Sequence, residues 1–233
     1  MELRSININI NFDVRSDSSG KDPDFASPTL KTYHKVLWSK PLPNGQIMLL
    51  EEGKGYYLRW NDIYLGSDSI IVSFMHARYK LRQLVMNSIP NFDSYREEYL
   101  RKSYTIAGSI LFPQIRWSMN QARGCSRKIS DRWDLTLECI RRFYAGESSP
   151  LDKALQRSER FFELFVDFKG YVDFFFLQDC VDSNYNVLLW LDTPLFVSDP
   201  MPESVESYKD WINKELIFVE NRSKRIKDYC GIK

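Results

Sequence analysis

The feature of this sequence that most restricts its fold is a change of hydrophobic period near Gly66. Before this glycine, apolar and polar residues alternate, most regularly from Ser5 to Phe12, and such alternation is typical of a half-buried strand. After it, apolar residues recur every three or four positions, first along a predicted helix over 70–89. The two periods predict an α+β fold, in which a mainly antiparallel sheet from the N-terminal half is packed by several helices in a single domain of residues 1–233.

Turn and capping residues set the expected boundaries of these elements. Asn44-Gly45 is typical of a hairpin turn. Ser27 and Pro28 are typical of a helix start, because a serine hydroxyl accepts from free amides of the first turn and proline fits the first position. Ser67 or Asp68 would cap the helix over 70–89. The other expected strands are 46–51, 56–60, 63–65, 104–112 and 187–191, and the other expected helices are 28–40, 93–102, 131–145, 149–168 and 202–229.

Composition and length exclude several classes of protein. A chain of 233 residues with 43% hydrophobic residues has enough apolar material for a large core, so disorder is not expected. The net charge of +1 gives no overall attraction to nucleic acid or anionic lipid, so any such partner must be held by a local patch. The four cysteines lack zinc-site spacing, no signal peptide is present, and no run reaches the roughly 18 apolar residues of a membrane span. We therefore expect a cytoplasmic protein with no membrane partner.

One local patch of positive charge stands out between Glu98 and Asp131, where no acidic residue occurs. An Arg-Gly step followed by a helix start is suited to an anion, because guanidinium groups and free amides can converge on phosphate oxygens. Ser130 is the expected N-cap of that helix. The alternative is that these are ordinary solvated charges on a loop. The six positive residues are Arg101, Lys102, Arg116, Arg123, Arg127 and Lys128.

The predicted helix that follows carries carboxylates on one face. Asp131, Asp134 and Glu138 are spaced i, i+3 and i+7, with Arg132 beside them. One interpretation is a set of carboxylates that positions a metal ion or reacting groups beside an arginine-lined phosphate site. The other is ion pairing within the helix and with neighbouring elements. No cofactor can be named from this pattern.

His34 is one of only two histidines and lies on a predicted aromatic helix. It is suited to acid-base chemistry near neutral pH, although a single histidine in such a helix also fits a structural role. The acidic loop before it, which includes Asp22 and Asp24, is explained by turn formation or by a divalent cation. The sequence has no phosphate-binding glycine loop, zinc-protease motif or nucleophile elbow.

Three phrases of the sequence resemble an uncharacterised family of stand-alone bacterial proteins. They are GKDPDFASPTLKTYHKVLWSKPLPNG (20–45), TIAGSILFP (105–113) and NQARGCSRKISDRWDLTLECIRR (120–142), and the similarity extends through SPLDKAL and VDFKGYVDFFFLQD. The resemblance implies one domain and a bacterial cytoplasmic protein. It implies no activity and no catalytic residue.

These observations lead to the hypothesis of a protein that recognises a phosphate-bearing ligand, a nucleotide or nucleic acid. Its sharper form is a nuclease or nucleotide-processing enzyme in a phage-defence or toxin setting. The alternative is a non-catalytic module that docks a protein partner. In the first hypothesis, Arg123, Arg127, Lys128 and Arg132 bind the anion, Asn120 orients it, and His34, Asp134 and Glu138 are the catalytic candidates.

Overall fold

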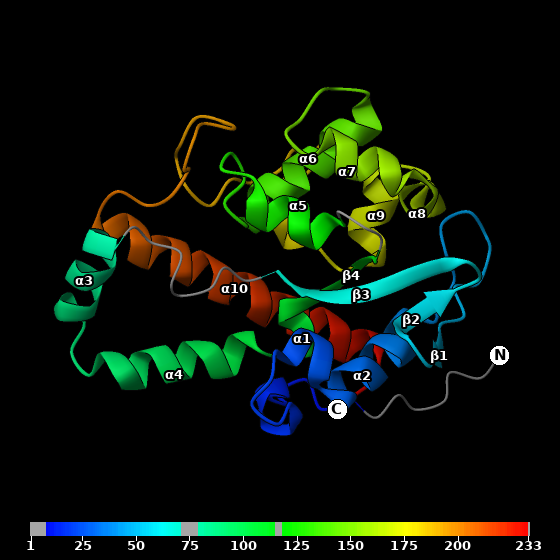
Figure 1. Ribbon diagram of the computed structural model, residues 1–233, viewed down its shortest axis with the longest axis horizontal. Helices are drawn as coiled ribbons and strands as arrows, with labels where there is room; N and C mark the ends of the chain where they lie inside the picture. The colour runs from blue at the N-terminus through cyan, green and yellow to red at the C-terminus, as the bar shows by residue number, and fades with distance from the viewer. Residues whose placement is uncertain (1–7, 71–78, 115–117, 233) are drawn as a thin grey trace.

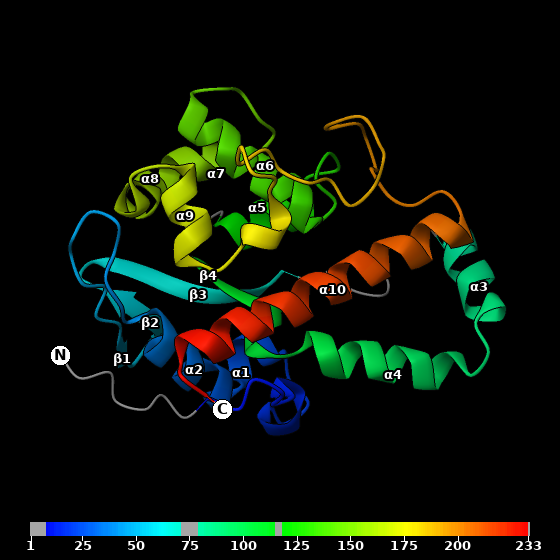
Figure 2. The same cartoon turned by 180° about the vertical axis from the view of Figure 1, so that it is seen from behind.

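The computed structural model describes residues 8–70, 79–114 and 118–232, and this part of the chain has an α+β fold (Figure 1). An antiparallel sheet lies at its centre, with helices on both sides (Figures 1 and 2). The buried side chains of these residues form one continuous hydrophobic cluster that includes both groups of helices and the sheet. The predicted fold class is therefore confirmed.

The sheet is a meander in which each strand pairs with the next along the chain. A tight turn at Asn61, with a φ of 53°, joins the second strand to the third. The fourth strand comes much later in the chain and pairs with the third from Leu65–Pro113 to Ser69–Ser109. Among the described residues the strands are β1 (Glu51–Gly53), β2 (Tyr56–Trp60), β3 (Ile63–Ser69) and β4 (Ser109–Pro113).

One side of the sheet is covered by a group of short helices that are close together in sequence (Figure 1). Aromatic rings fill the space between them, and the Phe165 centroid lies 5.3 Å from both Tyr171 and Phe175. Such pairs add to the stabilisation from apolar burial. The helices of this group are α5 (Met119–Cys125), α6 (Trp133–Ala145), α7 (Asp152–Arg157), α8 (Glu159–Phe162) and α9 (Phe168–Phe174), with the 3₁₀ turns η3 (Glu163–Phe165) and η4 (Gln178–Cys180).

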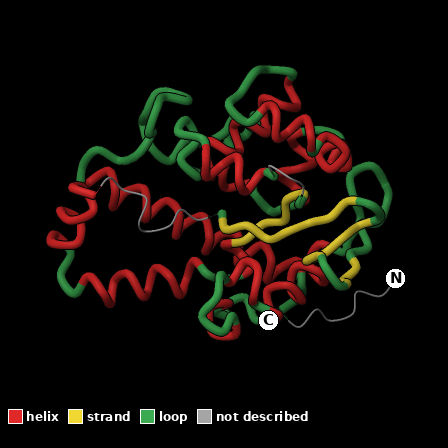
Figure 3. The backbone as a smooth tube through the Cα atoms, in the orientation of Figure 1, coloured by secondary structure: helices red, strands yellow, loops and turns green. Residues whose placement is uncertain are grey.

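The other side of the sheet holds helices from the two ends of the chain (Figures 1 and 2). The long C-terminal helix runs along this side, and two helices that contact it project away from the sheet (Figure 3). The helices here are α1 (Pro23–Ala26), α2 (Pro28–Trp38), α3 (Tyr79–Ser88), α4 (Phe92–Ser103) and α10 (Val205–Tyr229), with the 3₁₀ turns η1 (Val14–Asp17) and η2 (Ile106–Gly108). In the described part of the chain, none of the helices combines the length and the apolar character that crossing a membrane requires.

Several elements match the expectations closely because their signals are local. The Ser27 hydroxyl accepts from the amide of Leu30 at 3.0 Å, as expected of the cap of α2. Gly146 ends α6 with a φ of 69°, which glycine adopts without steric cost. The final helix begins after Ser204, which forms a capping box with Ser207.

Other expectations are wrong, and long-range contacts explain why. Residues 8–12 of the expected first strand contain a turn, closed by a bond from the Phe12 amide to the Asn9 carbonyl at 3.0 Å, while 5–7 lie outside the described residues. Ser67 and Asp68 do not cap a helix, because they pair with β4 inside β3. Of the expected helix over 70–89, residues 71–78 are also outside the described part.

The aromatic segment after α6 differs as well. The expected helix over 149–168 is divided into α7, α8 and η3, and Gly170 lies inside α9 instead of ending a helix. The expected strand over 187–191 is reduced to a single bridge between Val181 and Val187. In this region packing of large rings overrides the helical period of the sequence.

Candidate functional site

A cavity of about 280 Å³ is lined by side chains from α1, β2, β3 and the start of α5. Its wall combines carboxylates, hydroxyls and amides with two aromatic rings, and we call it the acidic cavity. The α1 helix packs against β3, which brings the loop before α2 to the end of the sheet. The residues that line it are Asp22, Asp24, Phe25, Tyr57, Gly66, Ser67, Asp68, Gln114, Ser118 and Asn120.

Local capping holds the short α1 helix in place. The Asp22 side chain accepts from the Asp24 amide at 3.1 Å, and Pro23 takes the first helical position. Asp17 then accepts from the Ser27 hydroxyl at 2.5 Å and from the Thr29 amide at 3.0 Å. These bonds join the end of α1 to the start of α2, so the position of Asp24 relative to α2 is fixed.

A chain of hydrogen bonds runs from the core to the cavity. The Trp38 indole nitrogen donates to His34 Nδ1 at 2.9 Å, and His34 Nε2 lies 3.1 Å from the Ser67 hydroxyl. Because an indole nitrogen only donates, Nδ1 accepts and Nε2 carries the proton of the neutral ring. The Ser67 hydroxyl in turn donates to Asp24 Oδ1 at 3.1 Å. His34 therefore positions Ser67, and Ser67 positions the Asp24 carboxyl.

The environment of His34 limits its own chemistry. The ring is completely buried, and this burial, with the nearby Arg222 charge, lowers the pKa of His34 to about 3. Both ring nitrogens are engaged, so neither is free to accept a proton. The arrangement gives His34 a positioning role in place of the acid-base role expected from the sequence.

The second carboxylate of the cavity, Asp68, is partly buried and is paired with Arg123. The Arg123 side chain has no exposed surface, and its guanidinium donates to Asp68 Oδ2 and to the Ser69 carbonyl at 3.2 Å. It also donates to the Thr136 hydroxyl at 2.9 Å and to the Asp131 carbonyl at 3.0 Å. Arg123 is therefore neutralised and fully bonded inside the protein, and its role is to hold Asp68.

The two carboxyl groups differ in their charge environment. Burial, with the neighbouring charges of Asp68 and Asp22, raises the pKa of Asp24 to about 7. Burial also raises the pKa of Asp68, but to about 6, because Arg123 opposes the shift. Asp24 thus carries a proton for part of the time at neutral pH, and Asp68 is the more easily ionised of the two.

Tyr57 and Asn120 complete the polar wall. The Tyr57 side chain is 5% exposed, and its hydroxyl is buried without a hydrogen-bond partner among the described residues. Orphaned hydroxyls of this kind are uncommon, because an unpaired polar group costs free energy when it leaves water. Asn120 donates to the Ser67 carbonyl at 3.1 Å, and no hydrogen bond to its side-chain oxygen is formed by the described residues. Both groups are suited to bind a polar ligand.

The other expected catalytic residues are engaged elsewhere. Asp134 is 1% exposed and accepts from the guanidinium of Arg132, which is itself fully buried and donates to the Pro200 carbonyl at 2.7 Å. Asp134 also accepts from the Trp190 amide at 2.8 Å. This pair joins the start of α6 to the connector before α10, and neither residue lines the acidic cavity.

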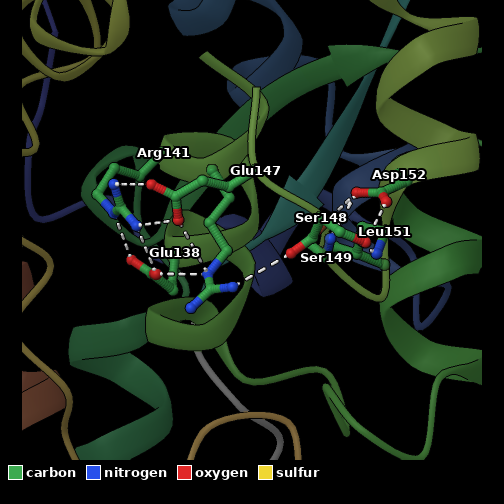
Figure 4. Close-up of polar contacts among 8 residues, drawn as sticks. Glu138, Arg141, Glu147, Ser148, Ser149, Leu151 and Asp152 are labelled. Carbon is green, nitrogen blue, oxygen red and sulfur yellow. Dashed lines mark hydrogen bonds and ion pairs between the residues drawn. The ribbon is translucent and has the colours of Figure 1, made fainter. Parts of the chain in front are cut away.

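Glu138 belongs to a surface-edge network that stabilises the C-terminal half of α6 (Figure 4). Its carboxylate accepts from Arg141 Nε and from Arg142 Nε, each at 2.8 Å. Arg141 also bonds Glu147 at 3.0 Å. The structure therefore favours the ion-pair interpretation for Glu138.

Arg127 and Lys128 are exposed and lie in the turn before α6. The expected N-cap, Ser130, has a φ of 49°, and the cap of α6 is instead Arg132 in extended conformation. Neither Arg127 nor Lys128 lines the acidic cavity, and Arg116 lies outside the described residues. Among the described positive residues of this stretch, Arg123 is thus a buried structural group, whereas Arg127 and Lys128 lie on the surface.

Of the expected site residues, Asn120 lines the acidic cavity. His34 and Arg123 lie behind its wall, where they bond to the lining residues Ser67 and Asp68. The carboxylates of the cavity were not singled out as catalytic candidates, and Ser67 and Asp68 were expected to cap a helix. A usable signal was present for Asp24, since it follows Asp22 at a spacing of two just before the helix that carries His34. Within the described ranges, no group of three or more histidine, cysteine or acidic residues is arranged to hold a metal ion.

Comparison with known proteins identifies a family but no activity. A sequence profile described as a family of unknown function (DUF6994) matches residues 8–226. No curated protein and no solved structure matches the chain. The matched range includes every residue of the acidic cavity, and it agrees with the family resemblance of the sequence phrases. The chain belongs to the DUF6994 family.

Proposed function

We propose that the protein is an enzyme that uses the acidic cavity for acid-base catalysis on a small polar substrate without net negative charge. Asp24 would exchange a proton with the substrate, and Asp68 would act as the ionised partner. Asn120 and Tyr57 would bind the substrate's polar groups.

The observation that carries this proposal is the state of Asp24. Asp24 is partly buried, its carboxyl accepts a bond from Ser67, and no cationic side chain among the described residues forms an ion pair with it. A pKa of about 7 means that both the protonated and the ionised forms are present at neutral pH. An acid-base catalyst is most effective in this condition, because it can both donate and accept.

The contrast between Asp24 and Asp68 supports a division of roles. Arg123 holds Asp68 in its ionised form, whereas Asp24 has only a hydroxyl donor. Enzymes that use two carboxyl groups often place them in environments that separate their proton affinities in this manner. Asp24 is therefore the proton donor in our proposal, and Asp68 stabilises positive charge or accepts a proton.

The charge of the cavity argues for the class of substrate. Its lining holds three aspartates and no lysine or arginine, because the Arg123 charge lies behind Asp68. A phosphate group would meet carboxylates here without a free cation beside it, which is unfavourable. Neutral or cationic molecules fit better, and the exposed Phe25 ring on the wall offers a stacking surface. A phosphate-bearing ligand remains a prediction for Arg127 and Lys128 only.

A ligand panel with a matched variant tests the proposal. Thermal shift would compare neutral sugars and polyols, organic amines, and adenosine and guanosine monophosphate, with wild type and Asp24→Asn in parallel. We expect stabilisation by a neutral or cationic compound, and we expect Asp24→Asn to abolish turnover of that compound while retaining measurable binding. Asp62→Asn, at an exposed ion pair with Arg160, is the control and should leave turnover unchanged.

Two results would overturn the proposal. The first is stabilisation by the nucleotides alone, which would favour the phosphate hypothesis instead. The second is full turnover by Asp24→Asn of a substrate that the wild-type protein converts, since proton transfer would then not depend on that carboxyl.

A further inference from the structure

A second site is centred on Lys40, which lies just after α2 and is 7% exposed. Its Nζ donates to the Phe174 carbonyl at 2.6 Å. Four aromatic rings surround the same nitrogen, and the nearest centroid, that of Phe176, is 3.8 Å away. The other three are Phe174 at 4.5 Å, Trp38 at 4.9 Å and Tyr229 at 4.9 Å.

Lys40 has no acidic partner in the part of the chain that the structure describes, since it forms no ion pair there. Its titratable neighbours are the Arg222 guanidinium and the Cys230 thiol. Arg222 is itself fully buried and is held by the carbonyls of Ala107, Ser109 and Phe175. Lys40 and the buried Arg222 therefore interact with one another, and neither forms an ion pair with a carboxylate among the described residues.

This environment makes Lys40 unusually easy to deprotonate. Burial, reinforced by the positive charge of Arg222, lowers the pKa of the Lys40 amine to about 7. The ring faces attract an ammonium and oppose the shift, but they do not replace the lost water and the missing carboxylate. Desolvation together with a neighbouring cation is the arrangement that turns a lysine into a nucleophile.

Lys40 also forms part of the wall of a cavity of about 520 Å³. The wall is mainly apolar, with Pro41, Pro43 and Phe165 beside Lys40, and the carboxylates of Asp167 and Asp173 also line it. Lys169, the other amine on the wall, is paired with Asp173. Of the two lysines that line this cavity, Lys40 is thus the one that forms no ion pair within the described residues.

Backbone strain marks the same place. Val166 on the cavity wall has a φ of 70° and a ψ of −53°, a tight γ-turn conformation that is costly for a β-branched residue. Phe176, whose ring lies nearest to Lys40, has a φ of 56°. Strained residues of this kind persist where the surrounding structure requires their position, and they are frequent at functional sites.

We propose that Lys40 is a nucleophilic amine that forms an imine with an uncharged aldehyde bound in this cavity. The amine lone pair forms the C–N bond while one N–H proton passes to the carbonyl oxygen, which gives a carbinolamine. The hydroxyl then leaves with the second amine proton as water, and a C=N bond remains. Nothing is oxidised or reduced, so the step needs no further reactant.

The lining selects an uncharged carbonyl compound. Proline and aromatic surfaces favour an apolar chain or ring. Asp167, which forms no ion pair among the described residues, disfavours a keto acid, because the carboxylate of a keto acid would meet a like charge. This site is separate from the acidic cavity, with which it shares no lining residue, so either proposal can fail without the other.

Reductive trapping tests the proposal on the native protein. The full chain is treated with propionaldehyde and sodium cyanoborohydride at pH 7, digested, and analysed by mass spectrometry for modification of each lysine. Exposed Lys54 and Lys209 serve as internal references. At pH 7 an amine with a pKa near 7 is about half uncharged, against about one part in 2,500 for an ordinary lysine, so we expect Lys40 to react at least about tenfold faster.

The same reaction in urea separates the folded-state environment from the local sequence. We expect the ratio of Lys40 to Lys54 labelling to fall to about one when the chain is unfolded, since an amine without burial has an ordinary pKa. The proposal is overturned if Lys40 in the folded protein is unmodified or reacts no faster than Lys54. It is also overturned if the ratio is the same in native and unfolded protein.

Discussion

Replacing Asp24 with asparagine isolates the free energy that comes from its unusual proton affinity. Asparagine has nearly the shape of the protonated carboxyl and can still accept from Ser67, but it does not titrate. The pKa of Asp24 rises from 3.8 in a model peptide to about 7 in the folded protein. A raised pKa means that the folded state binds more protons than the unfolded state between these two values.

The sign of the pH dependence follows from this difference. The contribution of Asp24 to stability is fully present below about pH 4, decreases as the pH rises toward 7, and is lost above that. A shift of roughly three units corresponds to about 4 kcal/mol in total, and about 3 kcal/mol of it falls between pH 5 and pH 8. Asp68 titrates in the same range and interacts with Asp24, so the two contributions are not simply additive.

Urea unfolding at pH 5, 6, 7 and 8 measures the effect. We expect the wild-type free energy of unfolding to decrease over this range, and the decrease in Asp24→Asn to be smaller by about 3 kcal/mol. Only the change with pH is compared, so a constant cost of the substitution does not affect the result. Asp62→Asn should follow the wild type, because the Arg160 ion pair keeps the pKa of Asp62 below its usual value and outside the range. Parallel curves for wild type and Asp24→Asn would refute the assignment of a near-neutral carboxyl.

Substitutions at Arg123 and Val166 examine charge burial and backbone strain, with Arg127 as the surface control. Arg123→Ala should destabilise the protein by about 3–5 kcal/mol, because it removes a fully buried guanidinium and leaves the partly buried Asp68 without its cation, whereas Arg127→Ala on the surface should change stability by less than about 0.5 kcal/mol. Equal effects of the two in urea unfolding would contradict the division into structural and surface arginines. Val166→Gly should raise stability by about 1 kcal/mol, because the side chain is 62% exposed and glycine relieves the positive φ; a lower unfolding midpoint would count against strain there.

The parts of the fold that sequence predicts are those set by neighbouring residues. The start of α2 depends on Ser27 and Pro28, and the end of α6 depends on Gly146, so each boundary can be predicted from a few positions. Ser67 and Asp68 have equally good capping chemistry, but their conformation is decided by pairing with β4, whose residues come much later in the chain. A local rule cannot include that distant strand, so it predicts a helix cap where the structure has the end of a strand.

The candidate site shows the same limit for charge. The acid-free stretch predicts that Arg123 binds an anionic ligand, but its partner in the structure is Asp68 of β3, which is brought to it only by the tertiary fold. A guanidinium that is free for a ligand and one that is neutralised by a buried carboxylate look identical in sequence. For Asp24 it is the pKa that the sequence does not predict. The raised pKa comes mainly from desolvation in the folded protein, whereas the sequence around Asp24 is typical of a polar loop.

The helix α2 connects the two proposed sites through one residue. The Trp38 indole nitrogen fixes the tautomer of His34, and His34 in turn orients Ser67 toward Asp24. The same indole ring lies against the Lys40 ammonium and the Arg222 guanidinium, at 4.9 Å and 5.7 Å from its centroid. An indole suits both tasks because it combines a single donor with a large electron-rich face. The buried end of α2 therefore supports a proton-exchanging carboxyl on one side, through His34 and Ser67, and a desolvated amine on the other, through the indole ring.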